Sequence, residues 1–574
     1  MPNVTHNTAV PDPSSAKALL TSGTTEEVIR SALEGVVLAP DSSVAWMTLA
    51  VTTHRSTRAD LAIQALGRIA ILSPGDSRVL NSLSDLLLAS RRVTEAKVCS
   101  IRSLILDPSM AAPYARCAEL DRQGNETSAA DLSRAVTWCT WALAIERDNL
   151  VYRFQLGTAL QEAGRLQEAL AVYDTALALY PGHADVLVNR GNAIKDLFRP
   201  KTALQIYYRA LRIKPHRTEL HANIGLALKE LHRLDEAIDS LNAAICAKPD
   251  YADAYWNKAL ALLLSGRFAE GWDLYEWRWQ RTGGPAIAIS NIARQWDGES
   301  SIAGRSLLIH SEQGLGDTLQ FCGLFHDLSN RGANISVLVD ENLKSLLRSN
   351  FSEVNFVTKN QPLPSFAFHI PLMSLPRVLG CNLLGKSPFA TRLKPPTEKV
   401  LKWSELVPPS EKLRVGLAWS GNPRHHNDRN RSISLERLLA YLPPDAQYFC
   451  LQRDVRSSDL RALRESPIRN FAREIENFAD TAGLCSLMDV VVSVDTSVAH
   501  LAAAMGQRCW ILLPFLPDWR WQLHRPDCPW YPTVELFRQP ENRSWKCVLE
   551  RVARRIKELS DRGTASPDLK DTNP

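Results

Sequence analysis

Small residues recur at one fixed interval along the first half of the chain. Glycines and alanines spaced 34 residues apart include Gly157, Gly191 and Gly225, then Ala169, Ala203 and Ala237, then Ala176, Ala210 and Ala244. Prolines at the same interval are Pro40, Pro74 and Pro108, and again Pro181, Pro215 and Pro249. Small side chains let two helices approach closely, and proline ends a helix because it lacks the N–H and restricts the residue before it. The pattern therefore predicts pairs of packed helices that repeat every 34 residues.

A helix pair repeated at this period is typical of tetratricopeptide repeats, which stack into an α-solenoid and form concave surfaces that hold peptides. We expect such a solenoid over residues 24–281, after a disordered N-terminus at 1–23. Pro108 and Pro181 are 73 residues apart, so one repeat carries about five extra residues, which we place around 124–130.

The last unit of the solenoid is rich in aromatic residues: Tyr255, Trp256, Trp272, Tyr275, Trp277 and Trp279. We interpret these as a hydrophobic cap where the repeats meet the next domain, with peptide binding as the alternative.

Beyond Arg281 the helical period gives way to short runs of β-branched residues, which predict strands. These runs cover residues 306–310, 335–340, 354–357, 414–419, 448–452, 490–494 and 509–513. Helical segments, such as 317–330 and 434–441, lie between them. Alternating strands and helices favour a parallel α/β sheet. We expect a linker at 282–305, one doubly wound α/β domain at 306–395, a second at 396–560 and a disordered tail at 561–574. Ligands of such sheets bind beyond the carboxyl ends of the strands.

Composition excludes several classes of function. A net charge of +5 over 574 residues, with no dominant run of Lys or Arg, gives no reason to expect a nucleic-acid partner. No apolar stretch approaches the ~18 residues that span a bilayer, and the polar N-terminus does not resemble a signal peptide. The 11 cysteines are scattered without a Cys-x-x-Cys pair, which is typical of reduced thiols. We therefore expect a cytoplasmic protein without a membrane span.

The turn after the first strand of the α/β region contains Gly314, Gly316 and Asp317. Two glycines leave room for a ligand beside the backbone, and the following helix directs its N–H groups at that ligand. Asp317 is a candidate general base in the cleft. The alternative is an acid that only stabilises the start of the helix.

Two further segments follow strands of the second α/β domain. In the first, Ser420 and Asn422 precede Arg429 and Arg431, which could clamp a diphosphate or lie in solvent. In the second, a helix of small residues begins immediately after the strand. Its candidate ligand residues are Asp495, Thr496, Ser497 and His500. Thr496 and Ser497 place hydroxyl and N–H groups where a phosphate would bind. His500 lies one helical turn beyond Thr496 on the same face, and could also be a core residue.

Taken together, Gly-Leu-Gly-Asp at 314–317, Asp-Thr-x-x-x-His at 495–500 and Pro-Phe-Leu-Pro-Asp-Trp-Arg-Trp at 514–521 resemble the heptosyltransferase-like (family 9) glycosyltransferases of the GT-B fold. The resemblance extends across the second half, and closer still are bacterial proteins in which such a domain follows tetratricopeptide repeats. It implies that Asp317 is the base, that 495–500 holds the diphosphate of the donor, and that Arg431 or Arg429 contacts it. The family usually has glycine where this chain has Ser497. The order of domains is similar to that of protein O-glycosyltransferases, including those that modify flagellin.

The sequence thus predicts an inverting glycosyltransferase that moves a sugar from a nucleotide-sugar to a Ser/Thr hydroxyl of a protein held by the repeats. No Asp-x-Asp motif is present, so we expect no metal and no cofactor beyond the nucleotide-sugar co-substrate. The alternatives are a non-catalytic repeat scaffold with a relic transferase domain, and a transferase that acts on a lipid or saccharide.

Three other motifs are interpreted as fortuitous. Residues 380–387 match a P-loop, but Pro388 follows at once and leaves no room for the phosphate-binding helix. Leu319 stands where a dinucleotide-binding motif needs its third glycine. His425 and His426 have no further metal ligands at useful spacing.

Overall fold

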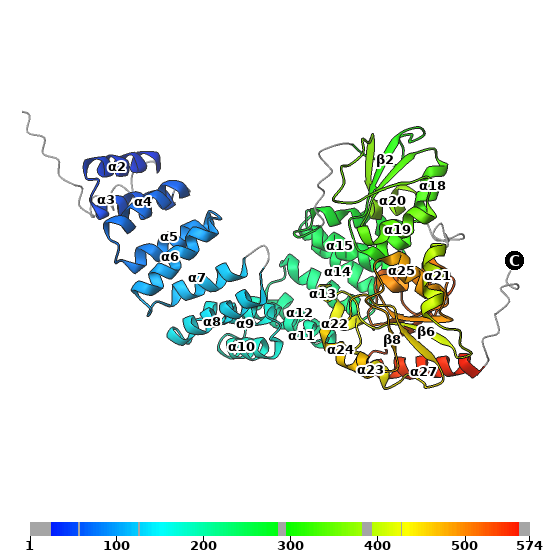
Figure 1. Ribbon diagram of the computed structural model, residues 1–574. Coiled ribbons are helices and arrows are strands. Elements are labelled where there is room, and N and C mark those ends of the chain that lie inside the picture. Colours follow the sequence, from blue (N-terminus) through cyan, green and yellow to red (C-terminus); the bar gives the residue numbers. More distant parts are fainter. Residues whose placement is uncertain are drawn as a thin grey trace, which may run out of the picture. The chain divides into compact units, whose positions relative to one another are not determined.

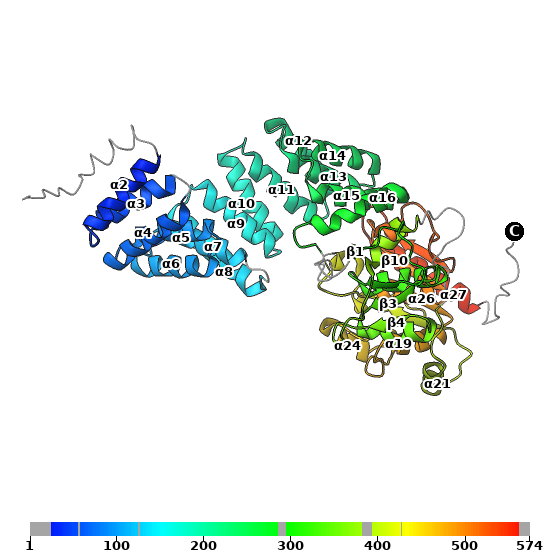
Figure 2. The same cartoon turned by 90° about the horizontal axis from the view of Figure 1, so that it is seen from above.

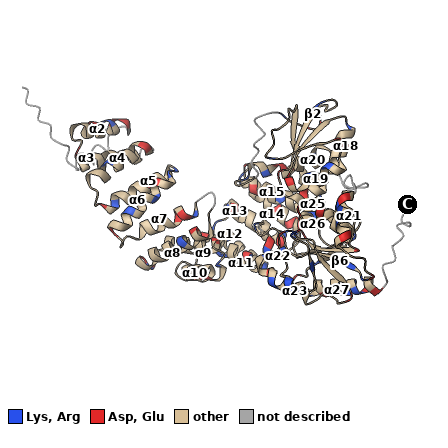
Figure 3. Ribbon diagram, viewed as in Figure 1, with Lys and Arg blue, Asp and Glu red and all other residues tan. Residues whose placement is uncertain are grey.

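The computed structural model describes residues 25–55, 58–123, 127–284, 294–380, 393–425 and 427–561. The chain forms two compact units, residues 1–223 and 224–574. In Figure 3, both acidic and basic residues are scattered over the helices of the two units. None of the described helices is long and apolar enough to cross a membrane.

The first unit consists of helices that follow one another in antiparallel pairs in chain order (Figure 2). They are α2 (Thr25–Leu38), α3 (Ser43–Arg55), α4 (Ala59–Leu72), α5 (Ser77–Ala89), α6 (Val93–Leu106), α7 (Ala111–Arg122), α8 (Ala129–Ile145), α9 (Leu150–Glu162), α10 (Leu166–Leu179), α11 (Ala184–Asp196) and α12 (Pro200–Ile213). The first helices of successive pairs begin 34 residues apart, except that α9 begins 39 residues after α7. The predicted helical solenoid is therefore confirmed.

The longer repeat distributes its five extra residues over two places. The α8 helix has 17 residues where α4, α6 and α10 have 14, so part of the insertion lengthens the helix. The rest lies in the turn before α8, which ends in a capping box. There the Ser128 hydroxyl accepts from the backbone N–H of Asp131, and the Asp131 carboxylate accepts from that of Ser128.

The recurring small residues lie where paired helices touch. A Cβ atom added to Gly157 would lie 2.3 Å from the ring of Tyr173, and one added to Gly191 would lie 2.4 Å from that of Tyr207. Ala169 and Ala203 have no solvent exposure. Each pair thus packs a ring against a bare backbone, which explains why glycine recurs at this interval.

The second unit begins within α13 (Thr218–Glu230) and includes the last repeats together with two parallel sheets. Its further repeat helices are α14 (Leu234–Ala247), α15 (Ala252–Leu264), α16 (Phe268–Tyr275) and the 3₁₀ helix η1 (Glu276–Gln280).

The first sheet has the order β1-β5-β2-β3-β4, and every pairing in it is parallel. Its strands are β1 (Arg294–Gln295), β2 (Ser306–His310), β3 (Asn334–Leu338), β4 (Asn355–Val357) and β5 (Phe368–Pro371). Its helices are α17 (Leu315–Phe321), α18 (Leu324–Asn330), α19 (Glu341–Asn350), η2 (Leu372–Ser374) and α20 (Leu375–Val378).

The second sheet has the order β11-β10-β9-β6-β7-β8 and is also parallel throughout. Its strands are β6 (Arg414–Ala418), β7 (Gln447–Cys450), β8 (Arg469–Asn470), β9 (Val490–Val494), β10 (Cys509–Leu513) and β11 (Val534–Arg538). Its helices are α21 (Thr397–Leu406), α22 (Asp428–Arg431), α23 (Leu435–Leu439), η3 (Ser457–Asp459), α24 (Leu460–Arg464), α25 (Phe478–Ser486), α26 (Ser497–Ala504), η4 (Trp519–Trp521) and α27 (Trp545–Asp561). Helices α19 and α25 lie against each other between the sheet of β2 and the sheet of β6 (Figure 1).

The aromatic residues of the last repeat pack into the α/β part of this unit. The Trp272 ring lies 5.1 Å from that of Trp519 and 6.0 Å from that of Phe321, between centroids, and Trp272 is 2% exposed. The Phe268 ring lies 5.5 Å from that of Trp530. These contacts agree with the interpretation of the aromatic residues as a cap. They also explain why the compact unit starts at residue 224, well before the change in sequence pattern near 281.

Candidate functional site

The turn between β2 and α17 fixes the side chain of Asp317. Gly314 is the N-cap residue of α17, and its backbone N–H donates to Asp317 Oδ2 at 2.7 Å. The other carboxylate oxygen, Oδ1, accepts from the Arg520 guanidinium. Both oxygens of Asp317 are therefore held in place. Because the carboxyl is largely buried, its pKa lies above the ordinary value, although the Arg520 charge opposes that rise.

Arg520 comes from η4, beyond β10, and contacts both α/β halves. Its Nη1 donates to Asp518 Oδ1 at 2.7 Å, and its Nε donates to Gln320 Oε1 at 2.8 Å. Its guanidinium also lies over the Trp519 ring, 4.2 Å from the centroid. Burial opposes ionisation of Asp518, but the Arg520 charge holds the pKa of Asp518 below its ordinary value.

The turn after β9 lies opposite this cluster. Strand β9 ends at Val494, and Thr496 is the N-cap residue of α26. The Thr496 hydroxyl makes no cap bond and lies 3.1 Å from Ser493 Oγ. The first N–H groups of a helix have no partner within it. The half-buried Ser497 begins α26, so this end of the helix is suited to an anion.

His500 is a buried and neutral residue of α26. Its Nδ1 lies 3.1 Å from the Tyr531 hydroxyl, and its ring stacks on Trp521 with centroids 5.1 Å apart. Burial lowers the pKa of His500 to about 3. Its Nε2 lies 4.0 Å from Asp495 Oδ1, and burial raises the pKa of Asp495 to about 6, with Asp518 adding to that rise. At neutral pH the two side chains therefore meet as a polar contact and not as an ion pair.

The 314–317 turn and the 495–500 loop, which the sequence singled out separately, contact each other directly. A Cβ atom added to Gly316 would lie 2.7 Å from His500 Cδ2, so α17 and α26 approach through a glycine. Any larger residue at Gly316 would push the Asp317 turn away from the 495–500 loop.

Arg431 is the one predicted arginine that reaches this loop. Its Nη1 donates to the backbone oxygen of Asp495 at 2.8 Å, and its guanidinium covers Gly421. Its Nε is buried without a hydrogen-bond partner. Ser420 is buried, and its hydroxyl accepts from Gln452. Asn422 and Arg429 are exposed, as is Gly314. The structure thus brings together Gly316, Asp317, Asp495, Thr496, His500 and Arg431.

Sequence reasoning gave no role to a second set of residues on the other side of Asp317. The Tyr275 hydroxyl, from the last repeat, donates to Gln313 Oε1 at 3.1 Å. Arg278 is 1% exposed, and its Nη2 donates to Glu312 Oε1 at 3.1 Å and to Ser374 Oγ at 2.7 Å. Its Nη1 donates to Glu276 Oε1 at 2.6 Å. Arginine and tyrosine among the tryptophans of the last repeat were the available signal, since a hydrophobic cap alone needs no buried cation.

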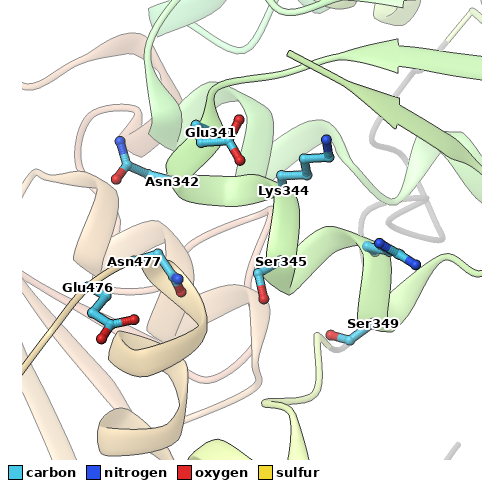
Figure 4. Close-up of a pocket in the computed structure, with 8 residues that line it drawn as sticks. Glu341, Asn342, Lys344, Ser345, Ser349, Glu476 and Asn477 are labelled. Carbon is cyan, nitrogen blue, oxygen red and sulfur yellow. The ribbon is translucent and has the colours of Figure 1, made fainter. Parts of the chain in front are cut away.

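An open pocket of about 600 Å³ lies along the same boundary between the halves but away from these residues (Figure 4). Glu341, Asn342 and Lys344 of α19 line one side, with Glu476 and Asn477 at the start of α25 on the other. Arg453 bridges the two sides, since its Nη1 donates to Asn342 Oδ1 at 2.8 Å and to the Glu476 carbonyl at 3.3 Å.

Two of the motifs interpreted as fortuitous fall partly outside the described residues. Residues 381–387 of the P-loop match and His426 lie outside the described residues, and His425 is exposed. In the described part of the chain, no group of three or more His, Cys, Asp or Glu side chains is arranged to hold a metal ion.

A family model of the tetratricopeptide repeat matches residues 154–217 and 223–276. The chain therefore contains tetratricopeptide repeats, a class of module that binds other proteins. It is 24% identical over 328 residues to Protein FlbA of Caulobacter vibrioides, a match that covers 52% of this chain and 54% of the relative. The chain thus spans about half the length of that curated relative.

Two solved structures are each similar to part of this chain. A chain of the APC/C hetero-tetramer Cut9–Hcn1 is 16% identical with a TM-score of 0.35, and the match covers 44% of this chain and 48% of that one. PilF of Pseudomonas aeruginosa is 19% identical with a TM-score of 0.30, covering 36% of this chain and 89% of that one.

Proposed function

We propose that this protein is an inverting glycosyltransferase with a GT-B-like pair of α/β domains. It transfers a sugar from a nucleotide-sugar to a Ser/Thr hydroxyl of a protein held by the repeats. One observation carries the proposal: the turn after β2 of the first sheet, which holds the buried Asp317, packs through Gly316 on His500 of the loop after β9 of the second. A cleft between the carboxyl ends of two parallel sheets is where such folds bind ligands.

The chemistry follows from the groups on each side. Asp317 takes the proton of the acceptor hydroxyl as that oxygen forms a bond to the anomeric carbon. The bond from this carbon to the diphosphate oxygen breaks, and the leaving nucleotide carries away the electron pair. The first N–H groups of α26, the Thr496 hydroxyl and the Arg431 guanidinium stabilise the charge on that leaving group.

Neutral His500 supports this arrangement without contributing charge. Because it is uncharged at neutral pH, it forms no ion pair with Asp495. Its packing against Gly316 instead sets the separation of the base from the donor loop. The nucleotide-sugar and the acceptor protein are the two expected partners, and the resemblance to flagellin-modifying transferases makes flagellin the first acceptor to test.

The test is the intact mass of an acceptor protein co-expressed with this chain or with its Asp317→Asn variant. The proposal expects a mass increase of one or more sugar residues with the wild type only. Equal masses across a panel of candidate acceptors, together with no hydrolysis of any nucleotide-sugar by the purified protein, would contradict it.

A second candidate function is a non-catalytic scaffold, which the match of the repeats to a protein-binding module favours. Donor hydrolysis distinguishes the two, because a scaffold with a relic domain releases no sugar. A transferase acting on a lipid or saccharide would hydrolyse the donor but leave the mass of every protein acceptor unchanged.

A further inference from the structure

We propose that Arg520 is a positioning residue of the transferase, which clamps Asp317 across the boundary between the two α/β halves so that the base stays oriented and ionised. The inference rests on the proposed function and assigns a role to Arg520, which belongs to the 514–521 motif but received no role from the sequence.

Three contacts carry the inference. Arg520 lies 203 residues from Asp317 in the sequence and comes from the opposite half, yet it donates to Asp317 Oδ1. It also donates to Gln320, one turn further along the helix of Asp317, and to Asp518 in its own half. Its guanidinium therefore joins α17 of the first half to η4 of the second.

The geometry leaves Asp317 ready to accept a proton. Gly314 N–H occupies one site of Oδ2, and Arg520 occupies one site of Oδ1. A carboxylate oxygen can accept two hydrogen bonds, so each oxygen keeps a site for a substrate hydroxyl. Burial raises the pKa of Asp317 and so favours its neutral form, whereas the charge of Arg520 beside it favours the carboxylate.

The titratable groups that interact electrostatically with Asp317 are Arg520 and Asp518 of the second half, Glu312, Tyr275 of the last repeat, and Tyr531. Arg520 lowers the pKa of Asp317, whereas Asp518 raises it. Removing the arginine must therefore move the pKa up, and removing the neighbouring carboxylate must move it down. If both substitutions move the acidic limb of the kcat profile, Asp317 is the group that titrates during turnover, which a merely structural ion pair does not predict.

The experiment measures the pH dependence of kcat and kcat/KM for full-length wild type, Arg520→Gln, Arg520→Lys and Asp518→Asn. The substrate is whichever of a panel of UDP-, GDP-, ADP- and dTDP-sugars the wild type hydrolyses. For Arg520→Gln we expect kcat to fall about 10²-fold. We also expect the acidic limb of its pH–rate profile to shift to higher pH by about 1–3 pH units. Arg520→Lys keeps the charge and should restore most of the limb position, and Asp518→Asn should move the limb to lower pH.

Arg525→Gln is the matched control. Arg525 lies five positions further on and pairs with Asp527 in the same segment, but it does not contact Asp317. Its acidic limb should coincide with that of the wild type.

Binding of the matching nucleoside diphosphate separates the clamp from a phosphate ligand. We expect its Kd to change less than threefold in Arg520→Gln. A tenfold weaker Kd with an unmoved acidic limb would overturn the inference, because Arg520 would then bind the donor.

The inference can fail separately from the proposed function. If the wild type releases no sugar from any donor, the proposed function fails. The role of Arg520 is then decided by infrared titration of ¹³C-labelled aspartate, read as wild type minus Asp317→Asn and repeated in the Arg520→Gln background. An Asp317 titration at the same pH in both backgrounds would refute the clamp, and a higher pH in the variant would support it.

Discussion

Replacing Arg278 by Met tests whether the last tetratricopeptide repeat is physically part of the α/β unit. The substitution keeps most of the length of the side chain and removes its charge. It leaves the buried Glu312 carboxylate without its guanidinium partner, and it also removes donors to Glu276 and Ser374.

The expected magnitude follows from burial. Arg278 is 1% exposed and Glu312 5% exposed, and removing one partner of a buried pair costs about 3–5 kcal/mol of unfolding free energy. The matched control is Arg281→Met, three residues on. Arg281 pairs with Asp253 at 2.6 Å, but the two side chains are 32% and 44% exposed, so its loss costs about 0–1 kcal/mol.

The loss of unfolding free energy in Arg278→Met should also depend on pH. Burial raises the pKa of Glu312 from 4.5 to about 7, and the Arg278 charge limits that rise. A carboxyl with a raised folded-state pKa contributes stability that is complete below about pH 4.5 and is lost as the pH rises through about 7. Without Arg278 the carboxyl can still take a proton at pH 5, so the variant should be less destabilised at pH 5 than at pH 8.

The measurement is urea unfolding of the full chain followed by tryptophan fluorescence. Twelve of the 15 tryptophans lie beyond Asn223, so the signal reports mainly the second unit. The reasoning is refuted if Arg278→Met and Arg281→Met lose the same stability, or if the loss in Arg278→Met is greater at pH 5 than at pH 8.

The remaining predictions concern catalysis and recognition. Asp317→Asn should lower the transfer rate about 10²–10⁴-fold with little change in nucleotide affinity, as measured by initial rates and calorimetry, and near-normal transfer would rule out Asp317 as the base. Thr496→Val should weaken binding of a nucleoside diphosphate by about 1–3 kcal/mol, and unchanged calorimetric affinity would show that the phosphates bind elsewhere. Removing the repeats before Leu150, with a polar new end, should preserve nucleotide binding and donor hydrolysis but abolish modification of the intact acceptor. If mass spectra showed undiminished modification of the acceptor, the early repeats would not be its binding surface, and only the later repeats could bind it.

The periodic part of the fold could be predicted from the sequence because each repeat contacts its neighbours. Glycine and alanine at a 34-residue interval specify the helix pairs, and the structure shows the rings of Tyr173 and Tyr207 against those glycines. The five extra residues were predicted in the turn after α7. Part of them lengthens α8 instead, because Ser128 caps that helix two residues before the predicted end of the insertion.

The predicted strands are confirmed at β2, β3, β4, β6, β7, β9 and β10, whose apolar residues fill the sheet interiors. Four strands were missed, namely β1, β5, β8 and β11. Strands β1 and β8 have only two residues each, β5 ends in Pro371, and β11 contains Glu535 and ends at Arg538. Their pairing depends on neighbours distant in sequence rather than on local propensity. Residues 317–330 likewise form the end of α17 and all of α18, with a break at Cys322 and Gly323.

Some residues of the candidate site could likewise be predicted from the sequence, and others could not. Residues that follow strands could be placed near one another, because parallel strands end at one edge of a sheet. The partners Arg520 and Arg278 could not, because their contacts join segments 203 and 34 residues apart and no spacing rule connects them.

The last repeats are therefore connected to the proposed site by packing, not only by adjacency in the chain. Tyr275 and Arg278 hold the Glu312–Gln313 segment that leads into Asp317, and Trp272 packs on Trp519 beside Arg520. Close-packed protein interiors transmit small displacements instead of absorbing them. In the proposed transferase, an acceptor bound against α15 and α16 would therefore alter the position of Asp317 and of Arg520 together. The change in sequence pattern near Arg281 marks a change of secondary structure, but it does not divide the repeats from the site.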